Sequence, residues 1–148
     1  MNTKGAITTI RAGLVFLVLA QGGAGVLQLF GPRTFYDDFP LPSSPWVSLL
    51  PPYNEHLMRD VGALTLALVL VLTAAAIWPE RRLVQVALAA NLMFTVPHFV
   101  FHATHVDHYP TGSAIGLIVT LGLAVLLPAA LLAPTRRLPR AALDKGDS

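Results

Sequence analysis

All five histidines of this chain fall in two short segments, residues 54–60 and 98–108. Imidazole is a common metal ligand and proton carrier. His98, His102 and His105 are spaced by four and three residues, so a helix would carry them on one face. Two of them could bind one ion, but about 10.5 Å of helix axis separates His98 from His105. Other donors would have to complete the shell, and the candidates are Glu55, His56 and Asp107. This pattern predicts a transition-metal or haem site as one interpretation.

The other polar segment, residues 54–60, contains two pairs at helical spacing. Glu55 and Arg59 are four residues apart, as are His56 and Asp60, so each pair shares a face if the segment is helical. Asn54 precedes them. We expect this segment to contact His98 or His102, because unpaired polar side chains are costly in an apolar environment.

Three interpretations of this polar cluster stay open. In the first, the histidines have a structural role and form hydrogen bonds at a helix end, and the chain is an accessory or ligand-binding protein. They could hold a metal or haem in a membrane redox protein. They could also relay protons, since His98 is titratable and falls inside an apolar stretch. In each case we expect His98, His102 and Asn91 to point into the bundle rather than at lipid. The sequence has no GxSxG, HExxH or P-loop motif and no cysteine, so thiolate sites are excluded and enzymatic activity is undecided.

The elements that must position these residues are four apolar stretches. Hydrophobic residues make up 54% of the 148 residues and charged residues 12%, about half of the roughly 25% that is usual in soluble domains. A membrane-spanning helix needs about 20 apolar residues. The stretches free of Asp, Glu, Lys and Arg lie at about 12–30, 61–78, 83–101 and 113–133. They predict an all-α, four-helix transmembrane bundle in one domain, with a polar tail over residues 134–148.

The basic residues predict the orientation. Short loops on the cytoplasmic side are rich in Lys and Arg. If the N-terminus is cytoplasmic, eight of the ten basic residues lie inside and only Arg33 and Arg59 lie outside. Both termini are then cytoplasmic, and all five histidines lie on the outer side of the plasma membrane. Since the basic residues flank membrane segments, we expect the lipid bilayer and no nucleic acid as partner.

One alternative concerns the first stretch. Val18-Leu19-Ala20 before Gln21 could be a signal-peptidase site. Cleavage there would leave three spans. The apolar run continues to Phe30, which favours an uncleaved anchor.

Small and polar residues predict how the helices pack. Gln21 and Gln28 share one face, which should point into the bundle. Gly112 and Gly116 form a GxxxG motif, which favours close packing within the bundle, with a homodimer or another membrane-protein partner as the alternative. A long proline-rich outer loop, residues 31–60, joins the first two spans.

The layout resembles the DoxX-like group of small bacterial four-helix membrane proteins. Residues 54–62, Asn-Glu-His-Leu-Met-Arg-Asp-Val-Gly, lead from the proline-rich loop directly into an apolar helix. In that group an Asn, an Arg and a Gly often open the second span, which corresponds here to Asn54, Arg59 and Gly62. The resemblance implies the four-helix membrane fold, and some members are linked to redox or stress roles.

Overall fold

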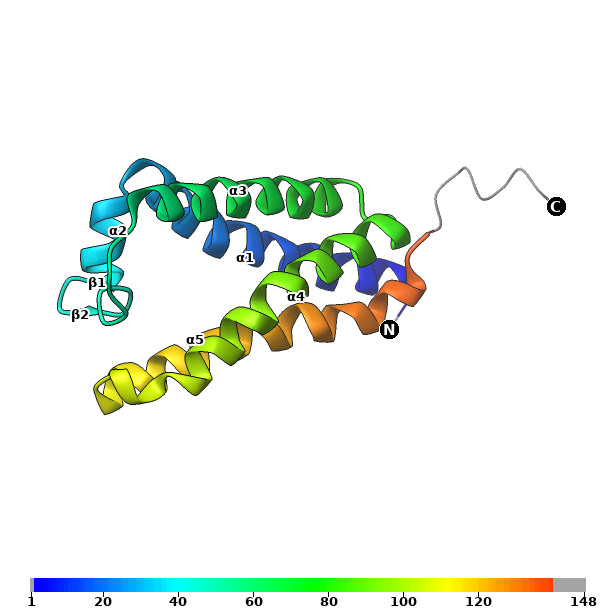
Figure 1. The fold of residues 1–148 in the computed structure, drawn as a ribbon. Helices are drawn as coiled ribbons and strands as arrows, with labels where there is room; N and C mark the ends of the chain where they lie inside the picture. Colours follow the sequence, from blue (N-terminus) through cyan, green and yellow to red (C-terminus); the bar gives the residue numbers. More distant parts are fainter. Residues whose placement is uncertain (1, 140–148) are drawn as a thin grey trace.

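The computed structural model describes residues 2–139, and almost all of this length is helical. Four long helices are joined by short elements (Figure 1). The long helices are α1 (Thr3–Phe30), α3 (Glu55–Ile77), α4 (Arg81–Thr104) and α5 (Thr111–Leu132). The short elements are α2 (Pro32–Asp38), β1 (Pro40–Leu41), β2 (Ser44–Pro45), η1 (Val106–His108) and η2 (Ala133–Arg137).

The four long helices are each long and apolar enough to cross a membrane. Each contains one of the apolar stretches predicted from the sequence, so the four-helix prediction is confirmed at that level. Two of the helices, α1 and α3, begin well before these stretches because asparagine side chains cap them. Asn2 accepts a hydrogen bond from the amide of Gly5 at 2.9 Å, and α1 therefore begins at Thr3 rather than near residue 12.

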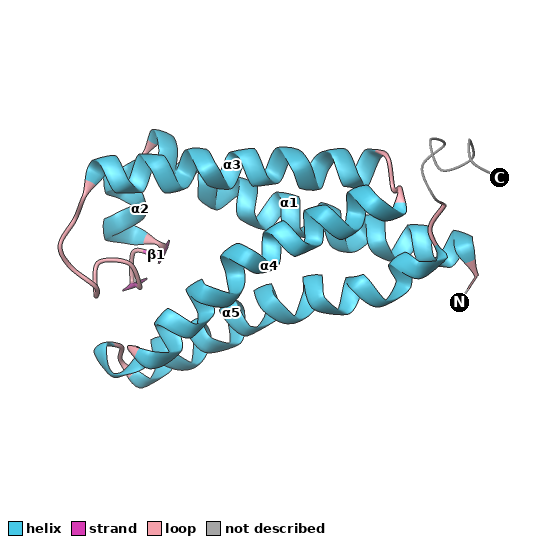
Figure 2. Cartoon of the chain, turned by 45° about the vertical axis from the view of Figure 1, so that its right-hand side comes forward, coloured by secondary structure: helices cyan, strands magenta, loops and turns pink. Residues whose placement is uncertain are grey.

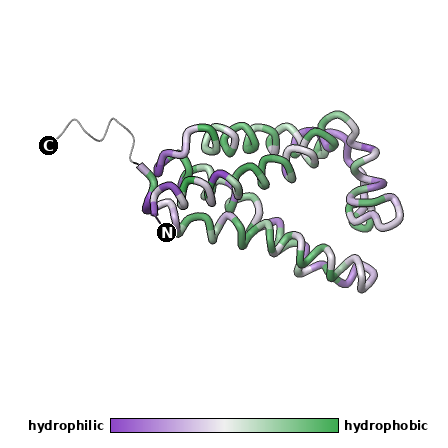
Figure 3. The backbone as a smooth tube through the Cα atoms, turned by 180° about the vertical axis from the view of Figure 1, so that it is seen from behind, coloured by the Kyte–Doolittle hydropathy of each residue, from purple (hydrophilic) through white to green (hydrophobic). Residues whose placement is uncertain are grey.

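The exterior of the long helices is apolar. Figure 3 shows hydrophobic backbone positions along the helices and hydrophilic ones gathered mainly near their two ends. Large apolar side chains are widely exposed, Met93 at 77% and Leu64 at 71% among them. Contiguous exposed apolar surface on this scale indicates contact with lipid or with another apolar partner.

The helices pair into two arms. We call α1 with α3 the first arm and α4 with α5 the second arm, after the pairs that pack most extensively. The arms meet at one end and diverge towards the other (Figures 1 and 2). The end where they meet, which we call the core end, holds residue 2, the turn from α3 to α4, and residue 139. The buried apolar core lies there and includes Ile10, Leu14, Leu72, Val84, Leu88 and Leu131.

A glycine sets the close approach within the first arm. A Cβ atom at Gly62 would lie 2.6 Å from the backbone nitrogen of Leu29 and 2.9 Å from the Cβ of Gln28. No side chain fits at that distance, so Gly62 allows the backbones of α1 and α3 to touch.

The segment between α1 and α3 is more ordered than a simple loop. It contains α2 and a two-stranded antiparallel hairpin in which Pro40 pairs with Pro45. The hairpin reaches the second arm, since the Ser44 and Ser113 hydroxyls are 3.0 Å apart. The Trp46 ring lies against Gly116, where a Cβ would be 3.2 Å from Cζ2. The second glycine of the GxxxG motif thus packs against the chain's own loop.

The predicted polar tail is described only in part. Its first residues form η2, in which the buried Thr135 accepts a hydrogen bond from Gln85 at 3.0 Å. Residues 140–148 lie outside the described part of the chain.

Candidate functional site

The start of α3 forms the first polar segment. Asn54 caps the helix by accepting a hydrogen bond from the Leu57 amide at 3.0 Å. Arg59 pairs with Glu55 at 2.7 Å, and His56 lies 3.2 Å from Asp60, as the helical spacing predicted. Arg59 also donates from Nη1 to the carbonyl oxygen of Leu29 at 2.5 Å. This arginine therefore ties the start of α3 to the end of α1.

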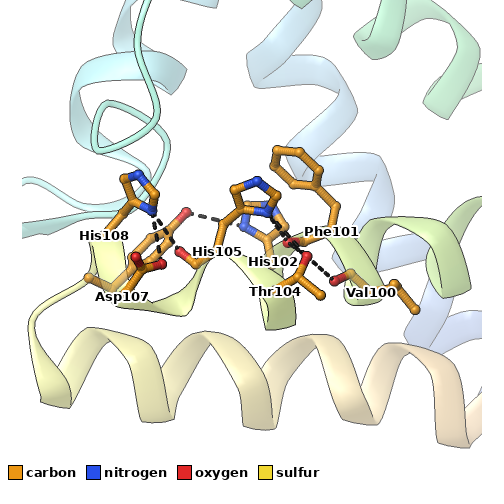
Figure 4. A network of polar contacts seen from close by, with 8 residues as sticks. Val100, Phe101, His102, Thr104, His105, Asp107 and His108 are labelled. Carbon is orange, nitrogen blue, oxygen red and sulfur yellow. Dashed lines mark hydrogen bonds and ion pairs between the residues drawn. The ribbon is translucent and has the colours of Figure 1, made fainter.

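The end of α4 forms the second polar segment, and most of its hydrogen bonds are local (Figure 4). His105 lies 2.8 Å from the carbonyl oxygen of Phe101, one turn earlier. His108 lies 3.2 Å both from the carbonyl oxygen of His105 and from Asp107. Most of these side chains are exposed or half-buried. They terminate α4 and shape η1.

His102 has a longer-range partner. Its Nδ1 lies 3.1 Å from the hydroxyl of Tyr109, a residue that is only 7% exposed. Burial raises the pKa of the Tyr109 phenol, so the phenol is neutral near pH 7 and can donate this hydrogen bond. The contact fixes the turn between α4 and α5. The sequence analysis did not predict Tyr109 as the partner of His102, although the two residues are only seven positions apart.

His98 differs from the other histidines. Its ring stacks on Phe94, with centroids 5.4 Å apart, and meets the His102 ring edge-on at 4.6 Å. The side chain is exposed, and within residues 2–139 no hydrogen bond to its ring nitrogens is found. His98 is thus an imidazole with free donor and acceptor positions on an apolar helix.

Of the side chains expected to point into the bundle, Asn91 does so, whereas His98 is exposed. Asn91 is fully buried and donates to Oε1 of Gln21 on α1 at 2.9 Å. Within the described residues, Gln21 Nε2 and Asn91 Oδ1 are buried without a hydrogen-bond partner. The pair connects the two arms but leaves one polar atom of each amide without a partner among the described residues. The inward face predicted for Gln21 is therefore confirmed, with a partner that was not foreseen.

The two polar segments do not meet, which corrects the expected contact between His98 or His102 and residues 54–60. The start of α3 is at the tip of the first arm, and the end of α4 is at the tip of the second (Figures 1 and 2). Asn54, Glu55, His56, Arg59 and Asp60 make the contacts described above within the first arm. The prediction failed because the arms pair as α1–α3 and α4–α5 and diverge at this level.

The metal interpretation requires at least three converging donors. In the part of the chain that the structure describes, no group of three or more His, Asp or Glu side chains is placed to hold a metal ion. His98 and His102 adjoin each other, but His56 and Glu55 belong to the other arm, and His105 and Asp107 contact their own neighbours. The predicted ligand set is therefore not assembled.

Comparison with protein-family models, curated proteins and solved structures finds no match for this chain.

Proposed function

We propose that the chain is a multi-pass protein of the plasma membrane with both termini in the cytoplasm. The four apolar helices and the positions of the basic residues support this topology. The diverging tips of the two arms, with all five histidines, then lie on the outer side. The resemblance of Asn54, Arg59 and Gly62 to the DoxX-like group agrees with this topology and stays a prediction.

We further propose that the protein acts as an accessory, ligand-binding protein and that His98 is the central residue of the binding surface. The observation that carries this proposal is the exposed imidazole of His98, which lacks a hydrogen bond within residues 2–139. His98 is two helical turns beyond Asn91 on the same face of α4, the face that contacts α1 through Gln21. Where the arms diverge, α1 no longer packs on this face of α4. A polar side chain left there facing hydrocarbon is costly.

The surroundings of His98 indicate the class of ligand. Phe94 stacks on the imidazole and is itself 39% exposed, so the surface combines an apolar ring with a hydrogen-bonding ring. Such a surface suits an amphipathic molecule with an apolar body and one hydrogen-bonding group. The remaining histidines each have a hydrogen-bond or ion-pair partner within the chain. A binding role therefore needs fewer assumptions than a catalytic one.

Site-specific photocrosslinking in native membranes tests this proposal. A photoreactive phenylalanine analogue at position 94, beside the unchanged His98, should give an adduct of one defined mass. The same amino acid at Met93, which is 77% exposed on the other side of α4, serves as the matched control and should give only heterogeneous lipid adducts. Identical products at both positions would contradict the proposal. Metal analysis and an optical spectrum of the same preparation test the redox interpretation independently.

A further inference from the structure

A groove runs along the outside of the first arm near the core end. Its volume is about 340 Å³, at the low end of the roughly 300–1,000 Å³ of ligand sites. It is lined by Arg11, Val15 and Val18 of α1 and by Thr73, Ala76 and Ile77 of α3. The groove is thus at the opposite end of the molecule from His98.

The groove has a cation at one end and apolar walls elsewhere. Thr73 contributes little polarity, since its hydroxyl donates to the carbonyl oxygen of Val69 at 2.7 Å. Val15 is 44% exposed and Ile77 55% exposed, so the walls are open to the surroundings of the helix pair. An alkyl chain could lie along these walls without burying a polar group.

Arg11 is held in place and still has donors to offer. Its Nε donates to the carbonyl oxygen of Ala76 at 2.9 Å, one of the last four carbonyls of α3, which have no partner inside the helix. This bond fixes the guanidinium beside the groove. Within residues 2–139, no other hydrogen bond or ion pair of Arg11 is found. Its two Nη groups can therefore bind an anion with two parallel hydrogen bonds.

The charge around the groove favours an anionic ligand. Six basic residues belong to the core end, and Glu80 is the one acidic residue there among those the structure describes. The basic residues are Lys4, Arg11, Arg81, Arg82, Arg136 and Arg137. Basic clusters at the cytoplasmic ends of membrane helices attract anionic lipids.

We propose that this groove binds an anionic phospholipid of the cytoplasmic leaflet. The phosphate accepts hydrogen bonds from the Nη groups of Arg11, and one acyl chain lies along Val15, Val18 and Ile77. The inference uses the proposed membrane topology and is independent of the ligand at His98.

Native mass spectrometry of the full chain in detergent micelles tests the inference. The probes are phosphatidylglycerol and phosphatidylcholine with identical acyl chains. We expect about tenfold tighter retention of phosphatidylglycerol, because its net negative charge is attracted by the basic core end, whereas the choline ammonium of phosphatidylcholine cancels the charge of the phosphate. Arg11→Gln should abolish this preference.

A second variant separates binding from folding. Val15→Phe should fill the groove and weaken phosphatidylglycerol binding about tenfold. Leu19→Phe, also on α1 but 70% exposed and outside the groove, should leave binding unchanged. Equal retention of the two lipids by the unmodified chain would overturn the proposal, as would equal effects of Val15→Phe and Leu19→Phe. Glycerol phosphate binding as tightly as the lipid would show a phosphate site without an acyl groove and would also overturn it.

The lipid-binding experiment gives a different result if only the proposed membrane topology is wrong. In micelles the groove is accessible whichever side of the membrane it faces in the cell. A reversed orientation would therefore leave the lipid preference intact and change only the leaflet.

Discussion

At the scale of single residues, Arg59 and Arg33 provide a matched comparison. Both pair with a carboxylate four residues away in the same helical segment. Arg59 also donates to the carbonyl oxygen of Leu29 in another helix, whereas Arg33 lies over the ring of Tyr53, 5.0 Å from its centroid. Of these two arginines, Arg59 therefore joins two long helices and Arg33 does not.

We predict that Arg59→Ala lowers the free energy of unfolding by about 1–2 kcal/mol, because it removes a charged hydrogen bond and a helix contact. Arg33→Ala should leave stability unchanged, since exposed ion pairs contribute little. Thermal unfolding in detergent, followed by Trp fluorescence, measures both. Equal effects would show that the Leu29 contact adds nothing.

The buried amide pair permits a second prediction. Replacing Asn91 by Leu leaves Gln21 buried without a partner, and replacing Gln21 by Leu leaves Asn91 in the same state. The double variant removes both amides, so neither is buried without its hydrogen-bond partner. We predict that it is less destabilised than the sum of the single variants. The expected coupling energy is about 0.6–1.7 kcal/mol, from the average to the largest value measured for hydrogen bonds between membrane helices. Additive effects in this double-mutant cycle would argue against the hydrogen bond.

At the scale of elements, the first arm depends on the absence of a side chain at position 62. We predict that Gly62→Ala pushes α1 and α3 apart and costs about 1–3 kcal/mol of stability. Gly23→Ala is the control, because no atom lies within 4 Å of a Cβ there. That change should stabilise slightly, since Ala is the better helix former. If Gly62→Ala is as well tolerated as Gly23→Ala under thermal unfolding, the arms are not packed as described.

The sequence predicted the elements better than their pairing. Each long helix corresponds to an uninterrupted apolar run, a local property that can be read without knowing the neighbours. The inward face of Asn91 was also predictable, because the cost of exposing an amide to hydrocarbon does not depend on which helix covers it. The separation of His98 from Arg59 could not be predicted from the sequence, because it depends on which helices pair. The hydrogen bond from Arg59 to the carbonyl oxygen of Leu29 could not be predicted either, since every residue has a backbone carbonyl.

At the scale of the whole molecule, two arms join at a basic core end and diverge towards a histidine-bearing end. If the chain spans the membrane as proposed, these ends face different compartments. The lipid groove beside Arg11 then faces the cytoplasmic leaflet, and His98 faces the outer one. The membrane topology therefore decides which compartment each end meets.

Cysteine labelling tests this topology most directly, because the natural chain has no cysteine to interfere. Single variants Ser43→Cys, Asp107→Cys and Glu80→Cys each place a thiol at an exposed position. In intact cells, a membrane-impermeant maleimide should label positions 43 and 107 and should reach position 80 only after the membrane is opened. Labelling of position 80 in intact cells, with positions 43 and 107 protected, would contradict the account.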